Sequence, residues 1–352
     1  MKKILTMIFI DGMDGMAWGM LFTFGFGTIM QALGELLSKD FGDLLITLGG
    51  IAIMLTGAGI AMGITIKVPV APTIAIPTLL TGMIGAHADA IYQSSIITNE
   101  GAVKLTGPGD PLGACIAVLA TIVVGNIISG KTDWDLLLTP VVCIFSGSCA
   151  GLLFAPASDY LNHLFARSLE WATHQHVILM GILISCLMCI YTMLPISTLA
   201  LLNVANLSGL PAGAATIGCC CSLVGYALAS FQDNKYPGLA LQGLGTSKLQ
   251  LANTIKKPYI LLPPLLSSAI LGGISTGIFK LTNSAKGAAY GTTGLVGCIK
   301  AYNNIHKEMG STEALIVISL LCFVLPGALS LGIAEGMRKL KWLKEGDMKI
   351  SA

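Results

Sequence analysis

A long stretch without charged residues constrains the fold of this chain more than any other feature of its sequence. Residues 172–232 contain no Asp, Glu, Lys or Arg. Over all 352 residues, charged side chains make up 11% and hydrophobic ones 54%, whereas soluble globular proteins carry about 25% charged residues. So few charges cannot cover a water-exposed surface. The sequence excludes a soluble enzyme, a nucleic-acid-binding domain and a disordered scaffold, and it predicts a polytopic membrane protein.

Glycine and aromatic contents indicate which kind of membrane protein this is. The chain has 42 glycines, and aromatic residues make up only 7% of it. Small residues let membrane helices pack closely, whereas β-barrels carry girdles of aromatic residues. We therefore expect an all-α polytopic fold formed by a single membrane domain over residues 1–352.

Apolar segments long enough to cross a bilayer, about 20 residues each, recur along the chain. The single crossings expected from the sequence are residues 15–34, 44–66, 111–130, 136–158, 258–279 and 314–334. The stretch 172–232 is long enough for two crossings. Segment 68–86 contains three prolines, which remove helix hydrogen bonds and indicate a broken or partly re-entrant helix.

Basic residues at both ends set the expected orientation. Lys2 and Lys3 follow the first residue, and the short tail 338–352 is also basic. Short basic flanks favour the cytoplasm, so we expect both termini to be cytoplasmic and the number of crossings to be even. A weak additional crossing near 236–256 or 283–304 would bring the total to about ten. The amphipathic segment 159–171 is expected to lie along a membrane interface.

Two glycine-rich polar stretches are the best candidates for a binding site. The first covers residues 238–254 and the second 287–300, and each contains a Gly-Thr-Ser/Thr-x-Leu pattern. Non-helical backbone survives at membrane depth only where it is buried in protein or lines a cavity, and transporters bind solutes at such breaks. The alternative is that these glycines only allow close helix packing. The expected solute-binding residues are Gln242, Gly245, Thr246, Ser247 and Lys248 of the first stretch, with Gly291, Thr292 and Thr293 of the second.

Two charged residues in these apolar surroundings are functional candidates, because intramembrane charges are costly. Lys248 lies inside the first stretch, where an ammonium beside amides and hydroxyls would suit an anionic or strongly polar solute. Its alternative interpretation is a loop lysine at the cytoplasmic surface. Asp14 lies just before the first expected crossing and could place a charge within the membrane.

The ten cysteines all fall in apolar segments, where small side chains are expected to pack. Cys219, Cys220 and Cys221 are consecutive and point three ways around a helix, so they cannot form one ligand face. We expect no metal site, no cofactor and no catalytic residue.

Several segments resemble a known family. They include GDPLGACIA (109–117), LSGLPAGAATIGCCCSLVGYALAS (207–230) and YGTTGLVGCI (290–299). These segments are similar to the enzyme IIC family of the phosphotransferase system, and more narrowly to its perfringolysin O regulator-like (PfoR-like) branch. The resemblance implies a permease of the bacterial cytoplasmic membrane that works as a homodimer, binds its solute between re-entrant hairpins and cooperates with IIA and IIB subunits.

The chain departs from a complete sugar phosphotransferase. It carries no attached IIA or IIB domain, so a separate partner would supply the phosphate, and Lys248 stands in a stretch where sugar-specific members use a glutamate. The leading hypothesis is a permease that binds and translocates a small polar solute, a sugar or a small anion, by alternating access. The alternatives are a membrane-embedded sensor or regulator of gene expression, and a secondary carrier independent of phosphorylation. Nothing in the composition predicts a nucleic-acid partner.

Overall fold

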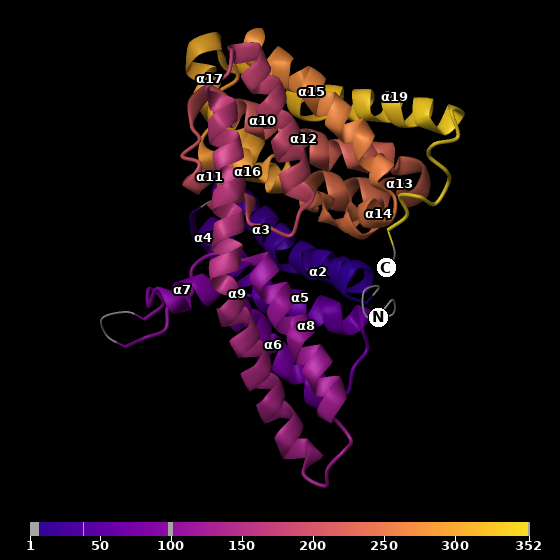
Figure 1. Ribbon diagram of the computed structural model, residues 1–352. Coiled ribbons are helices and arrows are strands. Elements are labelled where there is room, and N and C mark those ends of the chain that lie inside the picture. The colour runs from indigo at the N-terminus through magenta and orange to yellow at the C-terminus, as the bar shows by residue number, and fades with distance from the viewer. Residues whose placement is uncertain (1–6, 38, 98–100, 351–352) are drawn as a thin grey trace. The chain divides into compact units, whose positions relative to one another are not determined.

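The computed structural model describes residues 7–37, 39–97 and 101–350, and over this part of the chain it contains helices and no strands (Figure 1). Its helices fall into two compact units. The first comprises Met1–Leu161 with Pro195–Ser197, and the second comprises Asn162–Leu194 with Thr198–Ala352. These units subdivide the segment that the sequence treats as one domain, and each is described by itself below.

Six helices in the described residues are long and apolar enough to cross a membrane. They are Ile10–Leu36, Pro111–Ile128, Asp135–Thr173, Gly209–Ala229, Pro258–Gly277 and Ser311–Lys339. A bent helix pair raises this number to seven, and two shorter apolar helices are α6 (Pro72–Ala86) and α10 (Val177–Met193). The all-helical membrane architecture is confirmed, whereas the expected number of about ten crossings is not.

Three segments differ from the sequence expectation. Residues 44–66 do not form one straight helix, because α4 (Lys39–Met54) and α5 (Thr56–Lys67) meet at an angle of 57°. Segment 68–86 is not broken within its helix: Pro72 occupies the start of α6 and only Pro77 lies inside it. Residues 159–171 do not form a separate interfacial helix, since they continue α9 (Asp135–Thr173).

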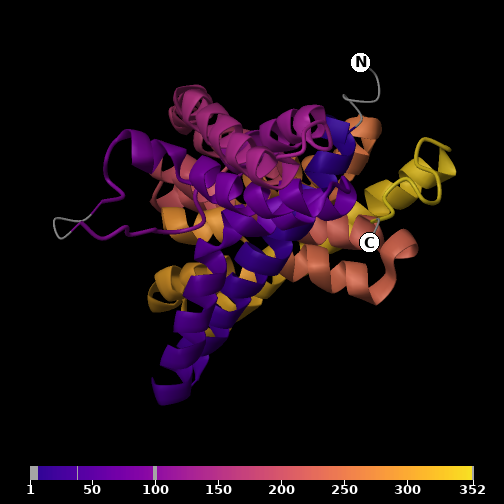
Figure 2. The ribbon, with the colours of Figure 1, turned by 90° about the horizontal axis from the view of Figure 1, so that it is seen from below.

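The first unit packs α2 (Met13–Met20), α3 (Phe26–Leu36), α4, α5, α6 and α8 (Pro111–Ile128) through glycines. Figure 2 shows α3 and α4 as an indigo pair running side by side. In the α2–α5 contact, a Cβ on Gly19 would lie 2.1 Å from the Gly59 carbonyl oxygen, and one on Gly63 would lie 2.0 Å from that of Gly15. Backbones this close leave no space for any larger residue, as expected for small-residue crossings in membranes.

Asp14 lies at this same helix contact. Its carboxylate is 3.0 Å from the Lys67 ammonium, and the two side chains are 10% and 19% exposed. Asp14 is therefore largely buried in the protein, and it has an opposite charge beside it; that this charge lies within the membrane stays a prediction. An ion pair of this kind avoids the cost of an isolated buried charge.

Asp89 provides a test of stability against pH in the first unit. It lies in the short helix α7 (Ala88–Tyr92), outside the spanning helices, and desolvation followed by the charges of Asp110 and Asp159 raises its pKa from 3.8 to about 6. Because the folded protein disfavours the charged form, stability should fall as the pH rises from about 4 to about 6. We expect Asp89→Asn to raise the melting temperature at pH 7.5 and to flatten this dependence. The exposed control Asp133→Asn should leave both unchanged.

The second unit is built around α12 (Gly209–Ala229), which packs against α10, α15 (Leu262–Gly277) and α19 (Leu325–Lys339). Nearly all residues of α12 are buried, and Tyr226 is its largest fully buried side chain. Its sequence is rich in Gly, Ala and Cys, so several helices can approach it at once. Gly218 illustrates this, since a Cβ there would lie 2.2 Å from the Ser185 carbonyl oxygen of α10.

Candidate functional site

Neither glycine-rich stretch forms a membrane-spanning helix. The first runs through α13 (Phe231–Ala240), a π-turn (Leu241–Gly245), a 3-10 turn (Ser247–Gln250) and α14 (Leu251–Lys256). The second runs through α16 (Ala285–Tyr290), a 3-10 turn (Thr293–Leu295) and α17 (Val296–Met309). Both stretches therefore consist of short helical segments separated by breaks, as the sequence predicted.

Glycine at position 291 is required by the break in the second stretch. Gly291 ends α16 with φ +52°, a backbone conformation that residues with a Cβ rarely adopt. A Cβ there would also lie 2.7 Å from the Cβ of Cys219 on α12. This turn brings Thr292 and Thr293 against the first stretch.

The two stretches are joined by their threonines. The Thr292 hydroxyl donates to the Gly243 carbonyl at 2.6 Å, and the Thr293 hydroxyl donates to the Gly245 carbonyl at 2.9 Å. Both threonines are buried. The sequence expectation that the two stretches lie together is confirmed, and each contributes groups of the kind that bind a polar solute.

The remaining expected residues of the first stretch are also buried and hydrogen bonded. The Thr246 hydroxyl accepts from the Lys248 N–H at 3.2 Å and caps the 3-10 turn, and Ser247 accepts from Ser222 at 2.9 Å. The Gln242 amide donates to the Ser230 hydroxyl at 2.9 Å, and its oxygen accepts from Gln250 at 3.0 Å. The eight expected residues thus form one region of the second unit, whereas Asp14 belongs to the first.

Lys248 is buried, so it is not a loop lysine at the surface. Only 6% of it is exposed, and its ammonium donates to the carbonyls of Thr192, at 3.0 Å, and Leu194. These carbonyls lie at the C-terminal end of α10, where the helix dipole favours a cation. Lys248 therefore fastens the first stretch to α10.

Sequence reasoning missed one polar face of the site. Ser222, Tyr226 and Ser230 are spaced four residues apart along and just beyond α12, and each hydrogen bonds to the first stretch. The spacing i, i+4, i+8 places three polar groups on one helix face. This pattern within the charge-free stretch 172–232 is the signal that could have identified them.

Three cysteines from three elements form the candidate metal cluster of the described residues. The sulfur atoms of Cys220, Cys298 and Cys322 all lie within 4.8 Å of one another. They belong to an apolar core cluster with Leu271 and Leu281. A divalent ion held by three thiolates would leave a net negative charge that these apolar neighbours do not balance, whereas uncharged thiols fit this environment. We interpret the cluster as packing; sequence alone could not place Cys220 beside cysteines so distant in the chain.

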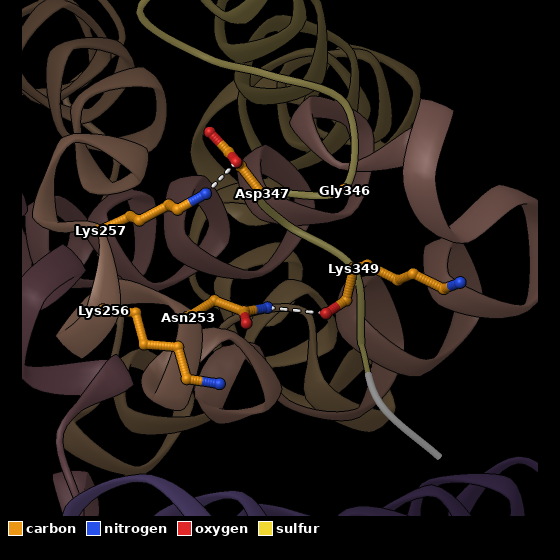
Figure 3. Close-up of a pocket in the computed structure, with 6 residues that line it drawn as sticks. All are labelled: Asn253, Lys256, Lys257, Gly346, Asp347 and Lys349. Carbon is orange, nitrogen blue, oxygen red and sulfur yellow. Dashed lines mark hydrogen bonds and ion pairs between the residues drawn. The ribbon is translucent and has the colours of Figure 1, made fainter. Parts of the chain in front are cut away.

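A pocket of about 250 Å³ lies beside the end of the first stretch (Figure 3). One wall is formed by Asn253, Lys256 and Lys257, and the other by tail residues including Asp347, which pairs with Lys257.

Desolvation raises the pKa of Asp347, but hydrogen bonds from Lys257, Lys344 and Tyr259 outweigh it and hold that pKa below 3.8. The hydrogen bond to Asp347 raises the pKa of Lys257. Because the folded pKa of Asp347 is depressed, its stabilisation persists above pH 3.8 and is lost only as the pH falls below that value.

Comparison with known proteins connects this fold and region to a family. Residues 10–350 match the family described as "Phosphotransferase system, EIIC". A comparison with curated individual proteins finds no match. The match covers nearly the whole chain, including both glycine-rich stretches and the helices that hold them. The chain therefore belongs to the phosphotransferase system EIIC family.

Proposed function

We propose that the chain translocates a small polar solute, most simply a sugar, by alternating access, and that the solute binds between the two glycine-rich stretches. The observation that carries the proposal is the pair of hydrogen bonds from Thr292 and Thr293 to the carbonyls of Gly243 and Gly245. They bring two hydroxyls and two backbone carbonyls together at breaks in an apolar helical unit. Transporters use such breaks as solute sites.

Family membership supplies the wider setting. As a member of the EIIC family, the chain is an integral membrane component of sugar transport that works with IIA and IIB subunits. We further propose the homodimer, the bacterial cytoplasmic membrane, the cytoplasmic termini and the approximately ten crossings that the sequence resemblance implies. The PfoR-like branch also belongs to this proposal, and no contact in the described residues favours the regulator alternative.

The chemistry of the two hydrogen bonds fits a hydroxyl-rich solute. Separating the stretches would leave the Thr292 and Thr293 hydroxyls and their two acceptors without partners. Each buried polar group left unsatisfied costs about 1–3 kcal/mol. Sugar hydroxyls are both donors and acceptors, so they can replace all of these bonds at once. We propose that this exchange stabilises the open arrangement when solute is present.

Uptake measurements test this function and its energy coupling. Right-side-out vesicles containing the chain, loaded with phosphoenolpyruvate and the soluble phosphate-carrying proteins, should take up radiolabelled sugars from a panel that includes small carboxylates as competing candidates. We expect uptake to require phosphoenolpyruvate together with the IIA and IIB subunits. Uptake that instead follows an ion gradient without these subunits would indicate the secondary carrier, and binding without uptake would favour the sensor.

Replacing Lys248 distinguishes a neutral solute from an anionic one. Lys248→Met removes the donors to the Thr192 and Leu194 carbonyls, so we expect stability to fall by about 1–3 kcal/mol. If the solute is a neutral sugar, uptake per folded molecule should remain close to that of the native chain. Lys248→Arg, which keeps the charge and donors, is the control. Selective loss of carboxylate uptake in Lys248→Met would instead assign the ammonium to solute binding.

A further inference from the structure

The segment after α19 returns to the first glycine-rich stretch and is held there by hydrogen bonds between its backbone and the side chains of other residues. This segment, Leu343–Ile350, is called the strap below. The Asp233 carboxylate accepts from the N–H groups of Gly346, at 2.9 Å, and Met348, at 3.1 Å. Asn234 accepts from the Ile350 N–H and donates to the Met348 carbonyl, both at 2.8 Å. Residues just before the first stretch thus fix the path of the strap.

Residues at the far end of the same stretch hold the strap a second time. Gln250 donates to the Met348 carbonyl at 2.8 Å, and Asn253 donates to the Lys349 carbonyl at 2.9 Å. Lys257 pairs with Asp347, as Figure 3 shows. Met348 is fully buried. The strap therefore connects the two ends of a stretch whose own backbone is broken.

Gln250 links the strap to a candidate solute-binding residue. Its amide nitrogen donates both to the Met348 carbonyl and to the side-chain oxygen of Gln242, the latter at 3.0 Å. Gln242 is fully buried, and its nitrogen donates to Ser230 and to the Gly238 carbonyl. These contacts fix which way the Gln242 amide faces. A change in the strap would remove one of the contacts that orient Gln250.

The strap is also attached in a manner that permits release. The pocket of about 250 Å³ lies between part of the strap and the residues Asn253, Lys256 and Lys257. On the side that faces the pocket, polar contacts rather than continuous apolar packing hold the strap. Asp347 is the central anchor, since it accepts from Lys257, from the Tyr259 hydroxyl at 2.9 Å and from the Lys344 N–H at 2.9 Å. Removing one carboxylate would therefore weaken three contacts at once.

We infer that the strap Leu343–Ile350 positions Gln242 through Gln250 and so controls the conformation of the first glycine-rich stretch. This inference rests on the proposed function for its importance to transport, because Gln242 is a residue of the proposed solute site. Gln250 and the strap are positioning elements, with no contact to solute assigned to them. When the strap is bound, the first stretch is ordered; when the strap is released, the backbone at the breaks in that stretch can change conformation.

Hydrogen–deuterium exchange on the full-length chain in lipid nanodiscs tests the strap without any solute. Asp347→Asn should increase exchange at least threefold in peptides covering the strap and residues 238–257. The matched control Glu345→Gln changes the same charge at an exposed strap position and should leave exchange unchanged. Peptides from α8, in the other compact unit, report whether the fold is intact.

A second variant keeps the test decisive. Gln250→Met retains side-chain length but loses the shared donor, so it should deprotect residues 241–245 while the other anchors keep the strap protected. Its melting temperature measures the stability lost with these buried hydrogen bonds. If the strap is released in Asp347→Asn but residues 238–257 keep native exchange, the inference is overturned. A strap that stays protected in that variant overturns it as well. Since neither readout needs solute, its failure is separate from a failed uptake experiment.

Discussion

The double variant Gly19→Ala/Gly63→Ala should lose about 2–6 kcal/mol of stability, because its two methyl groups have no space. The new Cβ atoms would lie 2.1 and 2.0 Å from the carbonyl oxygens of Gly59 and Gly15. These are backbone atoms, so no side-chain rotation relieves the contacts and α2 must move away from α5. Overpacking costs about 1–3 kcal/mol per site. The separation would also disturb the Asp14–Lys67 ion pair beside the contact.

A matched pair of glycines provides the control. Gly332 and Gly336 both lie on α19, and a Cβ at either would meet nothing within 4 Å. Alanine has the higher helix propensity by about 1 kcal/mol, so the control double variant should keep or gain stability. Thermal unfolding can be followed by the reaction of a thiol-specific dye with buried cysteines such as Cys115. Equal melting temperatures for the two double variants would refute close packing of α2 on α5.

Local sequence patterns predicted the features that depend on composition and on backbone breaks. Few charges and many glycines indicated packed membrane helices, and both glycine-rich stretches are broken as expected. Their proximity followed from a physical argument: polar, non-helical backbone at membrane depth must be buried against protein. The contact of Thr293 with the Gly245 carbonyl agrees with that argument.

The missed features depend on partners that are distant in the sequence. Nothing near Lys248 indicates that the end of α10 will accept from its ammonium. The basic tail was expected to orient the chain, because short basic flanks favour the cytoplasm. Most of its strap contacts use backbone groups, such as the Met348 carbonyl, which no residue pattern reveals. The bend between α4 and α5 likewise occurs at Leu55, in a segment without proline.

Removing both hydroxyls between the two stretches should reduce transport at least tenfold and should also lower the stability of the fold. Thr292→Val/Thr293→Val keeps the size of both side chains but deletes the donors to the carbonyls of Gly243 and Gly245. The variant loses two hydrogen bonds and leaves two buried acceptors unpaired. We expect this to weaken the interactions between the stretches and with the solute by about 2–6 kcal/mol in total. Because each 1.4 kcal/mol corresponds to a factor of ten, we expect uptake to fall at least tenfold.

The controls separate this effect from general loss of structure. Thr292→Ser/Thr293→Ser retains both hydroxyls and should restore most of the uptake. Thr47→Val removes an exposed hydroxyl that bonds only within its own helix, to the Asp43 carbonyl at 2.8 Å, and should leave uptake unchanged. The valine variant must be shown to reach the membrane at native abundance. Its melting temperature then shows how much of the loss of uptake comes from reduced stability of the fold. If a folded Thr292→Val/Thr293→Val protein transports at the native rate with native affinity, then the threonines only join the two stretches. The solute path must in that case be sought elsewhere in the molecule, since the proposed exchange of hydrogen bonds depends on these two hydroxyls.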